Sequence, residues 1–288
     1  MTLRNDIEKK VCILGAGIMG VGLAHNFAEH GFEVTLFDKN QKALDNFKSA
    51  LSESYRLQCL VGHTKASLSE IINKIHVTNE AEHTREASYV VESTTENLSN
   101  KIDLLTIMNN YLNEDSIIAI NTSCIPIKAL NKHIRSPKNM LGIHFMNPVP
   151  LKSMVEIIKS DVTSTETIET SIALLKSIGK NGIIVNDSPG FVINRVFMVS
   201  INEAIKTLDE GVCHSPREID DLFINCLGHK MGPLMTADLI GLDTIVNSLE
   251  VLYDEYKNDM YKPARMLSKL VNQGYFGKKA GKGFYDYF

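Results

Sequence analysis

Residues 11–38 read VCILGAGIMGVGLAHNFAEHGFEVTLFD, and this stretch decides the fold. A short apolar run at 11–14 ends in glycines and is typical of a buried strand. The apolar spacing of residues 21–30 predicts a helix that ends before Gly31, and residues 33–37 predict a second strand. Strand, glycine loop, helix and strand in this order form the opening of a parallel α/β sheet.

The glycine loop reads GAGIMG and has the pattern G-x-G-x-x-G. This pattern needs Gly15 for a tight turn, Gly17 for close approach of a pyrophosphate to the backbone, and Gly20 for close packing of helix on strand. The first turn of the helix offers unpaired N–H groups to phosphate oxygens. We therefore expect the loop to bind a dinucleotide, with Ile18 and Met19 among the contact residues.

Asp38 ends the second predicted strand. Its carboxylate can accept hydrogen bonds from both ribose hydroxyls of an adenosine, and its charge would repel a 2′-phosphate. These properties favour NAD over NADP as the cofactor, although the neighbouring Lys39 weakens the preference. The competing interpretation is a glycine-rich turn without a ligand, and the flanking elements together with Asp38 argue against it.

Later apolar runs predict more strands, and a change of pattern after them predicts a second domain. Residues 41–61 are expected to form a helix, and from Gly190 onward the apolar spacing is helical throughout. The turn DSPG at 187–190 favours a helix start, with Asp or Ser as the cap. The predicted domains are therefore 1–187, an NAD-binding α/β domain, and 188–288, an all-helical domain. The further strands are expected at 75–78, 89–92, 117–120, 140–144, 155–158 and 182–186.

The composition is typical of a soluble globular protein, with 288 residues, 44% hydrophobic, 22% charged and a net charge of −4. Because a strong basic excess is missing, we expect neither nucleic-acid nor anionic-membrane binding. The charged N-terminus, MTLRNDIEKK, lacks the apolar segment of a signal peptide. The five cysteines form no CxxC pair and suit a reducing compartment. We expect a cytoplasmic protein without a metal site.

His144 stands out among the nine histidines because it ends the apolar run MLGIH. Open α/β sheets bind ligands at the carboxyl ends of their strands. Glu156 lies inside the apolar run MVEII, and a carboxylate among apolar neighbours needs a partner. If the two segments are neighbours, Glu156 can hold one ring nitrogen of His144 and leave the other as the base that a dehydrogenase needs. Spacing alone leaves a purely structural His–Glu contact open.

Further motifs follow in order along the chain. They are VVESTTENLSNK, NTS at 121–123, GIHFMNPVP followed by VEII, DSPGFVINR, MGPL, ADLIGLD and FGKKAGKGFYDY. With GAGIMG they span essentially the whole chain, which thereby resembles the 3-hydroxyacyl-CoA dehydrogenase family, including the 3-hydroxybutyryl-CoA dehydrogenases. The resemblance implies a Rossmann-type NAD-binding domain followed by an all-α domain similar to the C-terminal domain of 6-phosphogluconate dehydrogenase.

The resemblance also implies roles for individual residues. His144 would be the general base, and Glu156 the carboxylate that orients it. Ser123 would hydrogen-bond the substrate oxygen, and Asn194 would hold the substrate from the second domain. Ser54 matches a position that contacts CoA. The residues implied near the ribose and nicotinamide of NAD are Glu96, Lys101, Ser123, Asn147 and Lys279.

The chain departs from the family pattern where the carrier of the acyl group would bind. Residues 57–62 (LQCLVG) are uncharged where family members usually place a basic residue for the CoA phosphates, and His63 and Lys65 are the nearest candidates. HFMNPVPL and CLGHKMGPLMTADLIGLDT are similar to a branch that acts on glyceryl-ACP to make hydroxymalonyl or methoxymalonyl polyketide extender units. An acyl carrier protein (ACP) lacks the adenosine 3′-phosphate of CoA. We therefore weigh glyceryl-ACP slightly above the alternative, 3-hydroxybutyryl-CoA.

Two other functions stay open at this point. A β-hydroxyacid dehydrogenase would need the lysine of a G-x-x-x-K motif where this chain has Asn194. A non-catalytic NAD-binding protein would need none of the four candidate catalytic residues. Similarity to the family further implies a homodimer, for which the apolar segments 196–199 and 239–249 are candidates, although both segments suit the core of one domain equally well.

Overall fold

The protein is described by a computed structural model that covers residues 9–62 and 64–287. It divides into two compact units, of which the first ends at Asp187 and the second begins at Ser188. Each unit has a hydrophobic core of its own. Within the described ranges, no helix is both long and apolar enough to cross a membrane.

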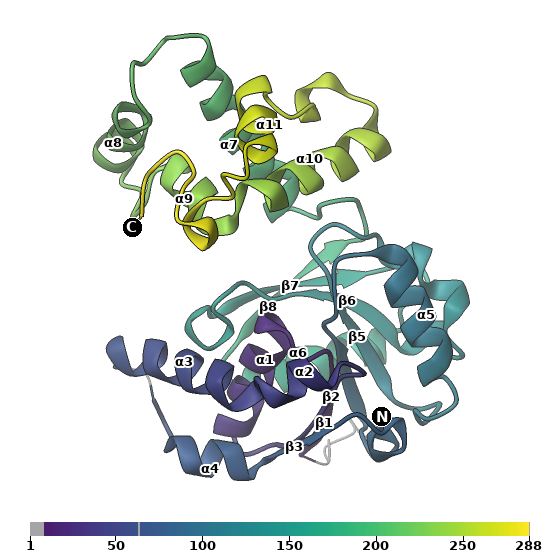
Figure 1. Cartoon of the computed structure of the whole chain (residues 1–288). Coiled ribbons are helices and arrows are strands. Elements are labelled where there is room, and N and C mark those ends of the chain that lie inside the picture. The colour runs from purple at the N-terminus through teal and green to yellow at the C-terminus, as the bar shows by residue number, and fades with distance from the viewer. Residues whose placement is uncertain (1–8, 63, 288) are drawn as a thin grey trace. The chain divides into compact units, whose positions relative to one another are not determined.

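The first unit is built on one sheet of eight strands in the order β3-β2-β1-β4-β5-β6-β7-β8 (Figure 1). Every strand expected from an apolar run is present. The strand order reverses between β1 and β4, and ligands of open α/β sheets bind beside the carboxyl ends at such a reversal. The strands are β1 (Lys10–Leu14), β2 (Glu33–Phe37), β3 (Ile75–Thr78), β4 (Tyr89–Glu92), β5 (Ile117–Asn121), β6 (Met140–His144), β7 (Met154–Lys159) and β8 (Asn181–Asn186).

The sheet is parallel from β3 to β6, but β7 runs antiparallel to β6, and β8 is parallel to β7. The parallel opening predicted from residues 11–38 is confirmed by β1 and β2, and no direction is predicted from the sequence for the last two strands. A parallel connection needs a crossover of about a dozen residues or more. Residues 145–153, between β6 and β7, hold only a short 3₁₀ turn, η5 (Val149–Leu151). The start of β7 consequently lies at the carboxyl edge of β6.

Both faces of the sheet are buried. In β1, Ile13 belongs to the core shared with α1 (Ile18–Glu29) and α6 (Thr165–Ser177). Its neighbour Cys12 is equally buried and points to the opposite face, because side chains alternate along a strand. In Figure 1, α5 (Leu98–Met108) lies on the other side of the strands from α1. Burial on both faces explains why these strands read as continuous apolar runs.

The single helix predicted for residues 41–61 is in fact two helices, α2 (Gln41–Asp45) and α3 (Phe47–Leu60). Asn46 ends the first and precedes the second. Asparagine is a poor residue for a helix interior because its side chain competes for backbone hydrogen bonds. The chain then passes through α4 (Leu68–Asn73) into β3.

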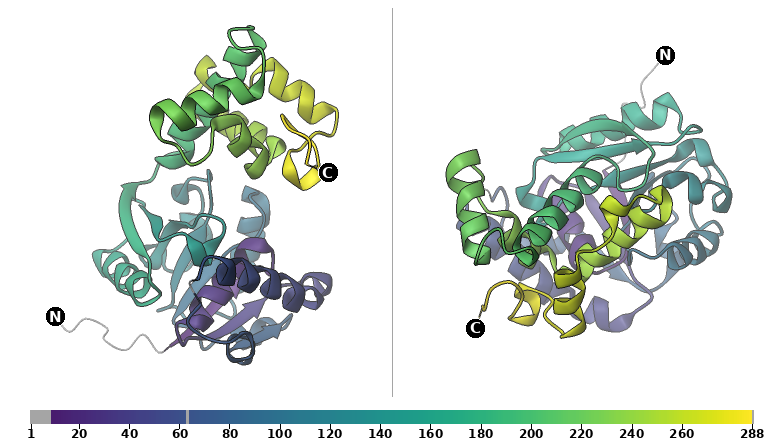
Figure 2. Two further views of the ribbon diagram at one scale, coloured as in Figure 1. Left: turned by 90° about the vertical axis from the view of Figure 1, so that its left-hand side faces the viewer. Right: turned by 90° about the horizontal axis from the view of Figure 1, so that it is seen from above.

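The second unit consists of helices and their connections, seen from two further sides in Figure 2. Residues 188–287 contain two isolated β-bridges but no strand, as the sequence predicts. Fully buried apolar side chains such as Ile201 and Leu249 form the core of the unit. The helices are α7 (Ile193–Asp209), α8 (Pro216–Leu227), α9 (Pro233–Ile240), α10 (Leu242–Tyr256) and α11 (Arg265–Asn272).

The turn before α7 does not contain the predicted cap. The N-cap position of α7 is Val192, whose side chain has no polar atom. The carboxylate of Asp187 instead accepts hydrogen bonds from the backbone N–H groups of Ile127 at 3.0 Å and Lys128 at 2.7 Å. The capping role predicted for Asp187 is therefore wrong, because its side chain is already bonded to the segment that follows β5.

Two buried aspartates hold the C-terminal segment to the helices of the second unit. Asp238 in α9 accepts hydrogen bonds from the backbone N–H groups of Phe284 and Tyr285, both at 2.9 Å. It also accepts one from the hydroxyl of Tyr287 at 3.1 Å, while Asp220 in α8 accepts one from the hydroxyl of Tyr285 at 2.6 Å. Burial raises the pKa of Asp238, and these donors oppose that effect.

Asp238→Ala should lower the free energy of unfolding of the second unit by about 2–4 kcal/mol, because two backbone N–H groups lose their acceptor. Tyr287→Phe removes one hydrogen bond and should cost about 1 kcal/mol. Chemical denaturation followed by circular dichroism measures both changes. An Asp238→Ala protein as stable as the unmodified one would contradict the anchoring role of this carboxylate.

Candidate active site

The glycine loop joins β1 to α1, and its backbone requires glycine at both ends. Gly15 has a φ of +111°, and a Cβ atom on it would lie 2.7 Å from the carbonyl oxygen of Ser93. A Cβ atom on Gly20 would lie 1.8 Å from the carbonyl oxygen of Gly15. Around Gly17, by contrast, no heavy atom of the described residues, apart from Gly17 and its two chain neighbours, lies within 4 Å of such a Cβ. A tight loop with open space over its centre fits a pyrophosphate.

The first turn of α1 and Asp38 complete the fit to a dinucleotide. The helix begins at Ile18, earlier than the predicted residue 21, and Gly17 at its N-cap makes no side-chain hydrogen bond to it. Ile18 is 77% exposed, so this turn faces the surface. Oδ2 of Asp38 accepts a hydrogen bond of 2.8 Å from the N–H of Ala16. The carboxylate expected at the ribose thus lies directly beside the glycine loop, as NAD requires.

His144 and Glu156 form a buried pair across β6 and β7. The antiparallel register places the two residues directly opposite each other. Nδ1 of His144 lies 2.7 Å from Oε2 of Glu156, and the two residues are only 4% and 7% exposed. The sequence left open whether the two segments are neighbours, and the structure shows that they are.

The geometry of this pair suits a proton acceptor. When Nδ1 donates its hydrogen to the carboxylate, Nε2 becomes the basic nitrogen of the ring. The buried carboxylate also stabilises the imidazolium that forms when Nε2 takes a proton. A structural contact would have the same hydrogen bond. The position of the pair favours a proton acceptor over a purely structural contact. His144 ends a strand at the same edge as the ends of β1, β4 and β5, where open α/β sheets bind their ligands.

Ser123 lies on a loop that Glu96 holds in place. Oε1 of Glu96 accepts hydrogen bonds from Oγ1 of Thr122 at 2.6 Å and from the backbone N–H groups of Ser123 and Cys124, both at 2.8 Å. Glu96, which the family resemblance places near NAD, therefore has a structural role of its own. It fixes the loop that presents Ser123 at the end of β5.

Asn121 connects this loop to the end of β6, and no role is predicted for it from the sequence. Its Oδ1 accepts a hydrogen bond of 3.3 Å from the N–H of Phe145, the residue after His144. Its Nδ2 donates to Oγ of Ser93 at 3.1 Å. The available signal was an amide at the end of the apolar run IIAIN, where a buried polar group needs partners.

Lys101 is buried within the first unit, and its predicted place near NAD is a proposal. Its side chain has no exposed area, and Nζ lies 2.5 Å from Oε2 of Glu92, which is equally buried. Nζ also donates to the carbonyl oxygen of Asn121 at 3.2 Å. The ammonium group therefore ties the ends of β4 and β5 to α5. Glu92 was overlooked in the sequence, although a carboxylate in the apolar run YVVE was a signal.

Ser54 and Asn147 also belong to the first unit. Oγ of Ser54, on α3, lies 2.8 Å from Nδ1 of His25 on α1. Asn147 is exposed and follows His144 by a few residues, on the connection to β7. Their predicted contacts, with CoA for Ser54 and with NAD for Asn147, are proposals.

Two predicted site residues, Asn194 and Lys279, belong to the second unit. Asn194 lies in the first turn of α7 and is 8% exposed. Nζ of Lys279 forms an ion pair of 2.7 Å with Asp243, at the start of α10. Lys279 is therefore already paired with a carboxylate, and its predicted contact with NAD is a proposal.

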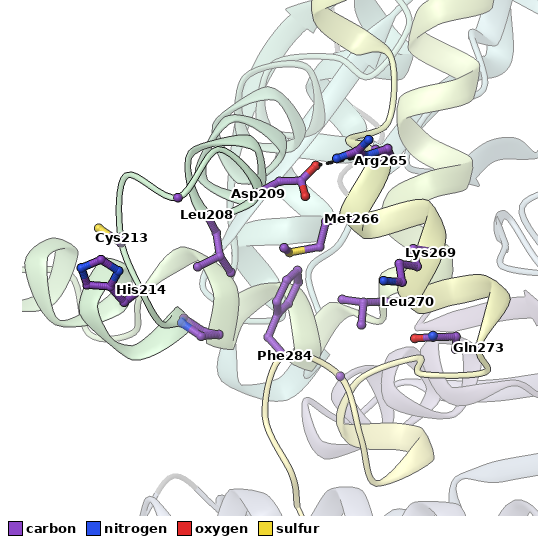
Figure 3. Close-up of a pocket in the computed structure, with 13 residues that line it drawn as sticks. Leu208, Asp209, Cys213, His214, Arg265, Met266, Lys269, Leu270, Gln273 and Phe284 are labelled. Carbon is purple, nitrogen blue, oxygen red and sulfur yellow. Dashed lines mark ion pairs between the residues drawn. The ribbon is translucent and has the colours of Figure 1, made fainter.

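The second unit also contains a hollow of about 930 Å³ between the end of α7 and α11 (Figure 3). Leu208, Met266 and Phe284 are directed towards it, and Arg265 and Asp209 form an ion pair of 3.6 Å beside it. The predicted site residues are not among those that line it. The hollow is therefore separate from the site predicted by sequence.

Two family models match the chain, and together they span nearly all of it. The 3-hydroxyacyl-CoA dehydrogenase NAD binding domain matches residues 10–188. The 3-hydroxyacyl-CoA dehydrogenase C-terminal domain matches residues 190–287. The first match agrees with the fit of the glycine loop and Asp38 to NAD.

Similar proteins lead to the same family. A probable 3-hydroxybutyryl-CoA dehydrogenase of Bacillus subtilis is 38% identical over 280 residues, 97% of each chain. A 3-hydroxybutyryl-CoA dehydrogenase of Clostridioides difficile is 35% identical over 96% of this chain and 99% of its own. The crystal structure of (S)-3-hydroxybutyryl-CoA dehydrogenase from Ralstonia eutropha has a TM-score of 0.89 at 36% identity, over 97% of this chain and 99% of that chain. The chain belongs to the 3-hydroxyacyl-CoA dehydrogenase family, and its first unit is the NAD-binding domain of that family.

Proposed function

We propose that the protein catalyses the NAD-dependent oxidation of the 3-hydroxyl group of a short-chain acyl-CoA, with 3-hydroxybutyryl-CoA as the first candidate substrate. The observation that carries this proposal is the buried His144–Glu156 pair at the carboxyl edge of a sheet whose first loop fits NAD. The names of the relatives from Bacillus subtilis and Clostridioides difficile support the choice of substrate.

His144 takes the proton in the proposed reaction. Oxidation removes a hydride from C3 and a proton from the hydroxyl oxygen, so that a C=O double bond replaces the C–OH group. NAD⁺, when bound, supplies the hydride acceptor. Nε2 of His144 accepts the hydroxyl proton, while Glu156 holds Nδ1–H and balances the positive charge that develops on the ring.

Ser123 acts on the substrate side of the same edge. Its loop is fixed by Glu96 beside the strand that His144 ends, and we assign its hydroxyl to the substrate oxygen. Asn194 is assigned to substrate binding on the family resemblance. The same resemblance assigns Glu96, Asn147 and Lys279 to the nicotinamide half of NAD.

We assign CoA as the carrier, whereas the sequence favoured ACP. The relatives named above carry CoA in their names, which favours the alternative over glyceryl-ACP. One observation keeps glyceryl-ACP as the second candidate: where a basic clamp was expected, the end of α3 exposes Leu57, Leu60 and Val61. Of the nearby basic candidates, His63 lies outside the described residues, and Nζ of Lys65 lies 3.0 Å from Nε2 of His30, the residue that follows α1.

Formation of NADH should be measured in parallel with (S)-3-hydroxybutyryl-CoA, glyceryl-CoA and glyceryl-ACP. We expect the highest kcat/KM with 3-hydroxybutyryl-CoA. Activity confined to glyceryl-ACP would reject the CoA assignment and retain the dehydrogenase chemistry. If none of the three substrates yields NADH, the protein is better described as a non-catalytic NAD-binding protein.

His144→Gln should lower kcat with the best substrate by about 10²–10⁴-fold, the usual contribution of a general base. Because the glycine loop is untouched, NADH binding measured by fluorescence should stay nearly unchanged. Glu156→Gln should have a similar but smaller effect. His76→Gln, at an exposed position on β3, is the matched control and should retain full activity. Near-normal turnover of His144→Gln would exclude His144 as the base.

Two glycine variants test two different effects: Gly17→Ala tests the close approach of the cofactor to the loop, and Gly20→Ala tests the packing of α1 on the loop. Gly17 has φ and ψ values of −75° and −176°, which alanine also adopts, and open space around it. Gly17→Ala should therefore keep its melting temperature and bind NADH about tenfold more weakly, a loss of about 1.4 kcal/mol. Gly20→Ala should lose about 3 kcal/mol of stability, because its Cβ collides with the loop. Calorimetry measures both effects, and equal effects in the two variants would contradict the proposed roles.

A further inference from the structure

Lys180 lies between α6 and β8 and is only 3% exposed, although lysine is rarely buried. Its Nζ donates hydrogen bonds to the carbonyl oxygens of Val149 at 2.6 Å and Pro150 at 3.3 Å. Both carbonyls belong to η5, on the connection that leaves His144 for β7. One buried ammonium group therefore holds two successive carbonyl groups of this connection.

The turn held by Lys180 packs against α1, the helix that begins at the glycine loop. Val149 is 2% exposed, and a Cβ atom on Gly22 of α1 would lie 3.3 Å from its Cγ2. Further along α1, Nδ2 of Asn26 donates to the carbonyl oxygen of Ile178 at 3.2 Å, close to Lys180 in the chain. The segment that contains Lys180 is therefore bonded both to η5 and to α1.

Glu29, at the end of α1, is the acidic group that acts on Lys180. Burial lowers the pKa of Lys180 to about 8, the attraction of Glu29 opposes this shift, and the positive charge of Lys65 adds to it. The carboxylate of Glu29 also accepts hydrogen bonds from Nε2 of Gln58 and the N–H of Lys65, both at 2.8 Å. The other titratable groups on this side of α1 are His25 and His30, whose pKa values are lowered by burial.

A lysine at this position loses the hydration of its ammonium group, which an apolar residue would not do. An ammonium group is unfavourable away from water unless its donors find acceptors, whereas methionine would fill the same space without that penalty. What methionine cannot do is hold two backbone carbonyl groups at fixed positions. The geometry therefore indicates that the role of Lys180 depends on its hydrogen bonds to these two carbonyl groups.

We propose that Lys180 is a positioning residue for the oxidation proposed above, on which this inference rests. Its ammonium group fixes η5 against α1 and so sets the path of residues 145–148, which follow the catalytic strand and include Asn147. In this way the end of β6, with His144, keeps a defined position relative to the helix that begins at the NAD loop. Lys180 acts through the backbone and is not itself assigned to substrate or cofactor.

Three variants test the positioning role. Lys180→Met removes the hydrogen bonds while keeping the side-chain length, Lys180→Arg keeps a cation with several donors, and Lys176→Met changes an exposed lysine of α6 as the control. Lys180→Met should lower kcat by about tenfold or more with little change in KM, since small displacements of reacting groups cost up to about 10²-fold. Lys180→Arg should restore much of kcat, and Lys176→Met should change nothing. A kcat of Lys180→Met within about twofold of the unmodified protein would overturn the proposal.

Hydrogen–deuterium exchange of the same variants separates this inference from the proposed function. Lys180→Met should speed exchange at Leu151 and Lys152, whose N–H groups bond to the carbonyls of Pro148 and Val149, and Lys180→Arg should slow it again. Faster exchange throughout the first unit would show general destabilisation and overturn the proposal. A local effect supports positioning by Lys180 even if the unmodified protein oxidises no substrate, in which case only the proposed function is rejected.

Discussion

The hydrogen bond between His144 and Glu156 depends on a reversal of chain direction between β6 and β7. Because β7 is antiparallel, its first half lies at the carboxyl edge of the sheet, and Glu156 stands opposite His144 at 2.7 Å. A parallel β7 would begin at the other edge and carry Glu156 away from the ligand crevice. The short connection that imposes the reversal is also the segment that Lys180 holds. The contact between His144 and Glu156 and the support of the connection by Lys180 thus follow from one topological feature.

Other buried polar groups fix the same edge of the sheet. Glu92 and Lys101 neutralise each other inside the protein, and Lys101 also reaches the end of β5. Glu96 accepts three hydrogen bonds from the loop of Ser123, and Asn121 joins that loop to the residue after His144. Buried polar groups with satisfied partners make an arrangement rigid and specific. The edge is therefore ordered within the protein itself, before substrate or cofactor contributes any contact.

The strands and the glycine loop were predictable because each has a local sequence signal, whereas the contact between His144 and Glu156 was predicted only on the condition that their segments are neighbours. Apolar runs mark buried strands, and G-x-G-x-x-G marks the turn before α1. The direction of β7 was not predictable, since alternation of side chains is the same in both directions of a strand. The burial of Lys101 and Lys180 was equally unpredictable from the sequence. Their partners, the carboxylate of Glu92 and the carbonyl oxygen of Val149, come close to them only when the chain folds. When the sequence gives no sign of a partner for a lysine, the lysine is expected at the surface.

The tautomer of His144 tests the central claim most directly. Nitrogen NMR of protein labelled with ¹⁵N-histidine, with the signal assigned by its loss in His144→Gln, distinguishes the two ring nitrogens when the imidazole is neutral. The account predicts that Nδ1 carries the hydrogen, donated to Glu156, and that Nε2 is unprotonated and able to accept the hydroxyl proton. A neutral ring with its hydrogen on Nε2 would contradict it, because the nitrogen assigned as the base would then be a donor.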